Sequence, residues 1–166
     1  MPTKSLKKKL IGGTVGNAKV IVTPKKIIKT YGKRGKKAFE NELRVYKLAK
    51  LKKKEKKNEI DFIPKLLEYD EDKRKIVIEN VGVSLDKIIK KDKKKKDEFL
   101  PKIKKVYNKF VRIFKLYHND LRYKNIVYNK KKNKLYLIDF EFTSNIYEDK
   151  NNQGIVAKIS KKKKIS

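Results

Sequence analysis

The chain contains no cysteine and no tryptophan, and it has a single histidine among its 166 residues. Without cysteine it cannot form the disulfides that stabilise many small secreted domains. One histidine and no cysteine also cannot build a structural zinc site. These absences favour an intracellular protein, cytoplasmic or nuclear, whose fold depends on an ordinary apolar core.

Long apolar runs are missing as well. The first residues, MPTKSLKKKLIGG, contain no apolar region of the length that a secretory signal needs. No stretch approaches the ~18 apolar residues that a transmembrane helix requires. The sequence therefore predicts a protein without a transmembrane segment.

Acidic residues are scarce. The chain has 19 Asp and Glu and 49 Lys and Arg, which gives a net charge of +30. Such a charge attracts polyanions such as nucleic acid, anionic membranes or acidic proteins. A compositional bias toward Lys, Asn, Ile and Tyr explains the charge without a dedicated partner. No aromatic-rich RNA-binding motif interleaves the lysine runs. We therefore favour bias over dedicated nucleic-acid recognition.

Apolar periodicity predicts a mixed fold. Strands are expected at residues 18–22, 26–31, 63–69, 75–79, 126–128 and 134–138. Helices are expected at residues 36–51 and 97–117, with Asp97 as a cap of the second, and a shorter helix opens at Ser84 as its N-cap. Residues 52–58 are expected to form a charged linker. The order of sheet, helix, sheet, connector, helices and hairpin predicts an α+β fold.

The most informative segment runs from Tyr117 to Phe142, with the sequence YHNDLRYKNIVYNKKKNKLYLIDFEF. Asn125 follows Asp120 by five residues, and Asp139 comes at the end of an apolar strand. Phosphoryl transfer needs such groups. One carboxylate orients or deprotonates the attacking hydroxyl, while an amide and a second carboxylate hold Mg²⁺ against the nucleotide phosphates.

His118, Asp120, Leu121 and Asn125 have the order and spacing of the catalytic loop of the protein-kinase superfamily, which this chain resembles. The resemblance implies ATP and Mg²⁺ as cofactors. It makes Asp120 the group that accepts or orients the hydroxyl proton, and Asn125 and Asp139 the metal ligands. Arg122 takes the place of a lysine that contacts the γ-phosphate, so Asp120, Arg122 and Asn125 are the candidate catalytic residues. His118 is expected to support the loop backbone.

The resemblance extends to the nucleotide site. The segment KIIK ending at Lys29 resembles the strand that carries the phosphate-binding lysine of kinases. Glu42 is the expected ion-pair partner of Lys29, with Glu40 as the alternative. The glycine turn at Gly12, Gly13 and Gly16 matches part of the phosphate-binding loop. Glu79 ends the expected N-lobe, beside a connector whose backbone would pair with adenine.

Glu141 departs from the protein-kinase pattern, in which glycine follows the Asp-Phe pair. The runs HND at residues 118–120 and IDFEF at residues 138–142 are similar to those of choline and ethanolamine kinases, and more loosely to those of aminoglycoside phosphotransferases. Only residues 142–166 follow Glu141, so the lobe that normally recognises the acceptor is expected to be missing.

These observations predict a two-lobed, protein-kinase-like α+β fold with a truncated C-lobe. The expected divisions are a basic N-terminal segment at 1–9, a kinase-like N-lobe at 10–80, a minimal C-lobe with the catalytic hairpin at 81–146, and a basic tail at 147–166. An oligomer or a partner protein is expected to cover what the missing helices normally cover.

The predicted function is ATP- and Mg²⁺-dependent phosphoryl transfer, with serine/threonine protein substrates preferred. The positive charge would attract an acidic protein substrate, and such a substrate needs no deep acceptor pocket. One alternative is a small-molecule kinase. Another is an inactive kinase-like scaffold that binds nucleic acid or belongs to a virion, since the small size and composition also resemble proteins of large DNA viruses.

Overall fold

The computed structural model describes residues 18–55, 59–148 and 155–156. The basic N-terminal segment, the glycine turn and most of the basic tail lie outside the described residues. The division at residue 80 and the truncation of the C-lobe stay predictions.

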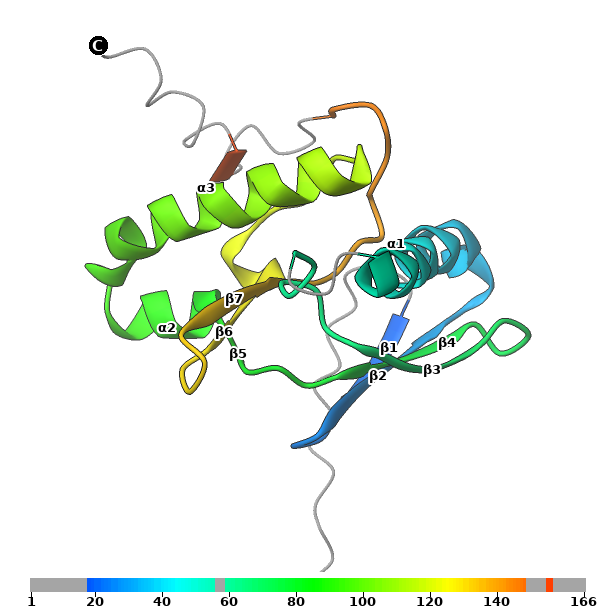
Figure 1. The fold of residues 1–166 in the computed structure, drawn as a ribbon. Coiled ribbons are helices and arrows are strands. Elements are labelled where there is room, and N and C mark those ends of the chain that lie inside the picture. The colour runs from blue at the N-terminus through cyan, green and yellow to red at the C-terminus, as the bar shows by residue number, and fades with distance from the viewer. Residues whose placement is uncertain (1–17, 56–58, 149–154, 157–166) are drawn as a thin grey trace, which may run out of the picture.

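The first layer is a four-stranded antiparallel sheet with strand order β1-β2-β4-β3 (Figure 1). Its strands are β1 (Ala18–Val22), β2 (Lys26–Tyr31), β3 (Leu66–Asp70) and β4 (Lys75–Glu79). The interior strand β4 buries Ile76, Val77 and Ile78, since β-branched side chains pack well on a pleated surface. This sheet carries Lys29 on β2.

Strand β3 begins at Leu66, so the prediction that it starts at Ile63 is wrong. Proline at position 64 has no N–H to donate to a strand ladder. The backbone before it contacts a different strand, since the Phe62 carbonyl accepts a hydrogen bond of 2.9 Å from the Leu137 N–H.

Helix α1 (Lys36–Glu55) follows a short 3-10 turn, η1 (Lys33–Gly35), and lies over one face of this sheet (Figure 1). The helix continues through Glu55, so the predicted linker at residues 52–58 is wrong over its first four residues. Lysine and glutamate are good helix formers, and lysines in the last turn complement the helix dipole.

The second layer is a three-stranded antiparallel sheet of order β5-β6-β7. It contains β5 (Val83–Ser84), β6 (Ile126–Asn129) and β7 (Lys134–Leu137). Helices α2 (Leu85–Lys91) and α3 (Lys95–Phe114) connect β5 to the catalytic loop, which contains a 3-10 turn, η2 (Tyr123–Asn125). Among the described residues, no helix is long and apolar enough to cross a membrane.

Of the two predicted helix caps, Ser84 occupies the N-cap position of α2 and Asp97 does not cap α3. Ser84 precedes α2, but its side chain makes no cap hydrogen bond, because its hydroxyl lies 3.3 Å from the carbonyl oxygens of Tyr123 and Lys124 instead. Helix α3 begins before Asp97, which therefore lies in its first turn. The helix ends before Tyr117 because Lys115 adopts a left-handed conformation with φ of 54°.

Helix α3 contributes a stripe of apolar side chains to the core that the two layers share. It buries Phe99, Ile103, Tyr107, Phe110 and Phe114, as its apolar spacing predicts. The Phe110 ring stacks on Phe114 at 5.1 Å and on Phe140 at 5.6 Å between centroids. Phe140 follows Asp139 directly, so the core fixes the backbone that carries the predicted metal ligand.

Replacing Phe110 by alanine should lower the free energy of unfolding by about 3–5 kcal/mol, because the side chain is fully buried and its loss leaves a cavity. Urea denaturation measures the change. The control Leu51→Ala removes a side chain that is 58% exposed and should change stability by under about 0.5 kcal/mol. Similar losses in the two variants would contradict the packing described.

Candidate active site

Lys29 lies at the centre of the candidate site. Its Nζ is 2.8 Å from Glu42 Oε2 and 2.9 Å from Asp139 Oδ1. Strand β2 supplies the lysine, helix α1 supplies Glu42, and the segment after β7 supplies Asp139. Burial alone would lower the pKa of Lys29, but the Glu42 and Asp139 carboxylates outweigh it and raise the pKa, so the ammonium stays charged.

The structure places Glu42, and not Glu40, against Lys29. The Glu42 carboxylate is fully buried. Glu40 faces solvent, where its carboxylate lies 3.9 Å from Lys36 Nζ on the same helix. The difference follows from helix geometry, because Glu42 shares the buried face of α1 with Phe39 and Tyr46.

Tyr31 and Glu141 complete the buried polar network. The Tyr31 hydroxyl donates a hydrogen bond to Glu42 Oε2 and lies 3.2 Å from Glu141 Oε1. Glu141 Oε1 is 3.8 Å from Lys29 Nζ. Burial and the neighbouring Asp139 charge raise the pKa of Glu141 to about 7. Sequence reasoning missed Tyr31 as a member of this network, since nothing distinguishes it from an ordinary core tyrosine at a strand end.

Asp139 has a strained backbone, with φ of 68° in the left-handed region. A non-glycine residue in such a conformation is held there by its surroundings, and strain of this kind clusters at functional sites. The side chain of Asp139 is 25% exposed, against 0% for Glu42 and 5% for Glu141. Asp139 is therefore the most open of the three carboxylates around Lys29.

The loop between α3 and β6 holds the candidate catalytic residues together. The Asn125 Nδ2 donates to the Asp120 backbone carbonyl at 2.8 Å and to Asp120 Oδ2 at 3.0 Å. Arg122 forms an ion pair with the same carboxylate, with its Nη2 2.7 Å from Asp120 Oδ2 and its Nε 2.7 Å from Asp120 Oδ1. Arg122 was predicted to contact the γ-phosphate, and the structure places its guanidinium on Asp120.

The catalytic loop is joined to the Asp139 segment by two backbone contacts. The Ile138 N–H donates to the Asn125 carbonyl at 3.1 Å, and His118 Nε2 lies 2.9 Å from the Ile138 carbonyl oxygen. His118 is fully buried, and burial lowers its pKa, so the neutral ring donates this bond. Its ring packs 5.2 Å from Phe140, in the supporting position expected from the sequence.

Asn119 is a residue that sequence reasoning missed. Its φ of 59° is left-handed, a conformation that asparagine tolerates better than most residues. Its Nδ2 lies 3.1 Å from the Phe142 carbonyl and 2.9 Å from Ser144 Oγ, and its Oδ1 accepts from the Glu148 N–H at 3.0 Å. Asn119 thereby fastens the segment after Glu141 to the catalytic loop.

Helix α1 fastens the same segment from the other side. Asn41 Nδ2 donates to the Glu141 carbonyl at 2.8 Å, and Arg44 Nη2 donates to the Thr143 carbonyl at 3.3 Å. Neither residue was predicted, because each contact joins positions about a hundred residues apart in the chain.

The remaining predicted nucleotide-binding residues are Glu79 and the three glycines of the expected phosphate-binding loop. The three glycines of the predicted phosphate loop lie outside the described residues. Glu79 ends β4, and its N–H already donates to the Lys65 carbonyl at 2.9 Å. Roles for these residues in nucleotide binding stay predictions.

The residues around Lys29 fit a magnesium ion. Oxygen atoms of Glu42, Asp139 and Glu141 lie within 4.8 Å of one another, and magnesium prefers hard oxygen ligands. Lys29 binds both Glu42 and Asp139, and the Tyr31 hydroxyl contacts Glu42 and Glu141. Asp139 is the most exposed of the three carboxylates, so it is the one most accessible to a metal. Asn125 makes its two donor bonds with its amide nitrogen, so its amide oxygen is the atom that would face a metal.

The pKa of Glu141 predicts how stability changes with pH in metal-free protein. The folded-state pKa of about 7 exceeds the ordinary value of 4.5, so between these values the folded protein keeps a proton that the unfolded chain releases. This contribution is full below pH 4.5 and is lost as pH rises through 7. Glu141→Gln should therefore gain roughly 1–2 kcal/mol relative to wild type between pH 5 and 7.5, after allowance for solvent screening.

Urea denaturation in the presence of EDTA at several pH values measures this difference. Glu40→Gln, at an exposed position on α1, is the control and should follow the wild-type profile. Parallel profiles for wild type and Glu141→Gln would show that the folded protein does not hold the Glu141 proton.

Comparison with solved structures shows a kinase-like fold. The chain matches a co-crystal structure of WbdD with a kinase inhibitor, with a TM-score of 0.59 and 14% sequence identity. The match covers 78% of this chain and 31% of WbdD, so the chain spans about a third of the length of that structure. A search of curated proteins gives no match.

Comparison with family models gives the more specific result. Residues 25–150 match the model of choline/ethanolamine kinase. The matched range contains Lys29, Glu42, Asp120, Asn125 and Asp139, and it extends over well more than half of the chain. The chain belongs to the choline/ethanolamine kinase family.

Proposed function

We propose that this chain is an ATP- and Mg²⁺-dependent phosphotransferase that phosphorylates the hydroxyl group of a small amino alcohol. The observation that carries the proposal is the contact of Lys29 with both Glu42 and Asp139. This contact brings a fixed cation next to a partly open carboxylate, which is what binding of a metal–nucleotide complex requires.

At the nucleotide end, Glu42 holds the Lys29 ammonium in place, and the hydrogen bond from Lys29 to Asp139 is the one that the α- and β-phosphates would replace. Asp139 and the Asn125 amide oxygen would supply the metal ligands, with Glu141 as a third oxygen donor. Bound there, Mg²⁺ would neutralise charge on the phosphate oxygens. The strained backbone of Asp139 keeps its carboxylate in place before the nucleotide arrives.

At the acceptor end, Asp120 accepts or orients the hydroxyl proton. Asn125 and Arg122 each bind its carboxylate, so its position is fixed from two sides. A proton acceptor must lie within hydrogen-bond reach of the hydroxyl that it activates, and these contacts keep the carboxylate from turning away.

The acceptor class follows from the family match. Choline and ethanolamine are amino alcohols, and a model named for kinases of these compounds supports the small-molecule alternative over serine/threonine protein substrates. The preference for protein substrates made from the sequence is therefore not supported, and neither is a viral origin.

An inactive basic scaffold is the rival function, and the buried network argues against it. Burying one lysine and several carboxylates carries a large desolvation penalty, and apolar residues of similar volume would often stabilise a scaffold better. A protein that needed only its surface charge would gain nothing from this network.

Replacing Asp139 by asparagine should abolish the stabilisation by Mg²⁺-ATP. A ligand at a hundred times its Kd adds about 2.7 kcal/mol to the free energy of unfolding, which a thermal melt detects as a shift of several degrees. The matched control Asp72→Asn lies on the exposed turn after β3 and should keep the shift. An equal shift in wild type and Asp139→Asn would exclude Asp139 as a ligand.

Replacing Asp120 by asparagine should lower kcat for phosphorylation of choline or ethanolamine by about 10²–10⁴, because the proton acceptor is lost. The thermal shift with Mg²⁺-ATP should persist, since Asp120 is not predicted to touch the metal. Transfer of the γ-phosphate from labelled ATP measures the rate. Undiminished transfer by Asp120→Asn would overturn the assigned role. Nucleotide binding without transfer to either amino alcohol would overturn the proposed acceptor class.

A further inference from the structure

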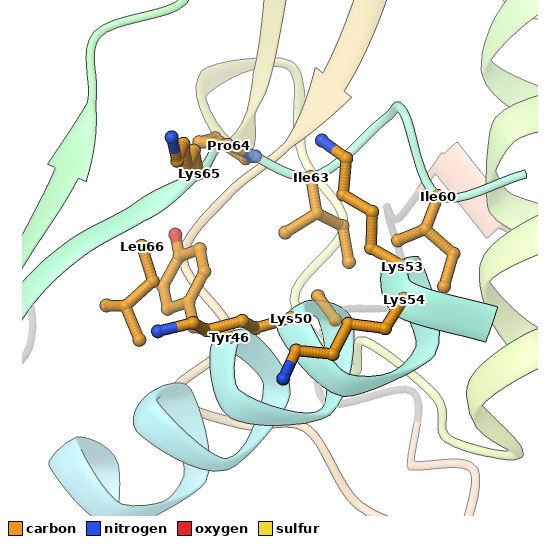
Figure 2. Close-up of a pocket in the computed structure, with 10 residues that line it drawn as sticks. Tyr46, Lys50, Lys53, Lys54, Ile60, Ile63, Pro64, Lys65 and Leu66 are labelled. Carbon is orange, nitrogen blue, oxygen red and sulfur yellow. The ribbon is translucent and has the colours of Figure 1, made fainter. Parts of the chain in front are cut away.

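A second site is indicated by a hollow of about 390 Å³ between the C-terminal half of α1 and the segment that leads into β3 (Figure 2). Its volume falls in the range of small-molecule sites, about 300–1,000 Å³. Its apolar wall is formed by six residues, Tyr46, Ala49, Ile60, Ile63, Pro64 and Leu66. Lys29, Asn125 and Asp139 do not line it, so it is separate from the candidate active site.

Four lysines complete the lining of this hollow. Lys50, Lys53 and Lys54 come from α1, and Lys65 comes from the segment before β3 (Figure 2). No acidic residue is among the lining residues that the structure describes. Within the described part of the chain, none of the four ammonium groups has a carboxylate within ion-pair distance.

The helix dipole does not account for the whole of this arrangement. The dipole favours cations in the last turn of α1, which explains Lys53 and Lys54. It does not explain Lys65, which reaches the same hollow from a different segment. Lys50, Lys53 and Lys54 also stand three and four residues apart, where like charges on a helix repel one another. An anion in the hollow would relieve this repulsion.

Tyr46 forms part of the inner wall of the hollow. It is 1% exposed, and burial and the neighbouring Glu42 carboxylate raise the pKa of its hydroxyl. Its ring also packs edge-on against Phe140, with 5.4 Å between centroids. Tyr46 therefore contacts both the hollow and Phe140 in the core.

We propose that this hollow binds a small amphipathic anion that consists of an aliphatic chain with one carboxylate head. The chain would lie against the apolar wall, and the head would pair with a lysine ammonium group at the edge of the hollow. A polar body such as a sugar would lie mostly against apolar side chains, which offer it few hydrogen-bonding partners. A cationic amphiphile would meet four like charges. Complementary charge and polarity therefore select this class of ligand.

The proposal is tested by calorimetric titration of the full chain with three probes that share a ten-carbon chain, all kept below their aggregation concentrations. Decanoate should bind, while decanol should bind at least tenfold more weakly and decyltrimethylammonium should show no binding. Octanoate, shorter by two methylenes, should bind about sixteenfold more weakly than decanoate, since each buried methylene contributes about fourfold. Equal binding of decanoate and decanol would overturn the role of the lysines.

Two variants locate the binding site. Lys50→Gln with Lys53→Gln should weaken decanoate binding about three- to tenfold. Ala49→Leu fills the hollow and should remove binding while circular dichroism shows an unchanged fold. The matched control Lys33→Gln with Lys37→Gln removes the same charge near the other end of α1, outside the hollow, and should bind as wild type. Equal weakening in the two double variants, or unchanged binding by Ala49→Leu, would overturn the proposal.

Discussion

The structure depends on the need to neutralise one buried ammonium group. Lys29 points from the first sheet into the interior, where an unpaired charge would be too costly to keep. Glu42 and Asp139 must therefore both lie within 3 Å of its Nζ, as they do. This requirement fixes α1 over β2 and brings the end of the second sheet against the first. The position of the site and the packing of the two layers are consequences of the same contact.

The apolar core and the polar network support each other around Phe140. Its ring lies between Tyr46 of α1 and Phe110 of α3, with His118 beside it. Such packing restrains the backbone on either side, and this is where Asp139 adopts its strained conformation. The hydrogen bond from Asn41 to the Glu141 carbonyl then restrains the next residue. The strain at Asp139 is therefore balanced by contacts that form only in the folded chain.

Much of the fold could be predicted because its signals are local. The bounds of β1, β2 and β4 follow from β-branched runs between turn residues, and the buried face of α3 follows from its apolar spacing. The errors fall at element ends, where longer-range contacts decide. Ser84 occupies the N-cap position of α2 but makes no cap hydrogen bond, because its hydroxyl meets the carbonyls of η2, which lie about forty residues away in the sequence. No pattern within α2 could indicate that contact.

The sequence predicted the candidate site best through residue types that are scarce in this chain. Lysine occurs almost everywhere in this chain, so a lysine at position 29 was weak evidence by itself. Acidic residues number only 19, and three of them, Glu42, Asp120 and Glu141, are buried. In a chain with a net charge of +30, composition alone does not explain a buried carboxylate that lies close to other carboxylates. The charge bias therefore strengthens the functional interpretation, because it makes the convergence of Glu42, Asp139 and Glu141 harder to explain as a solvated surface.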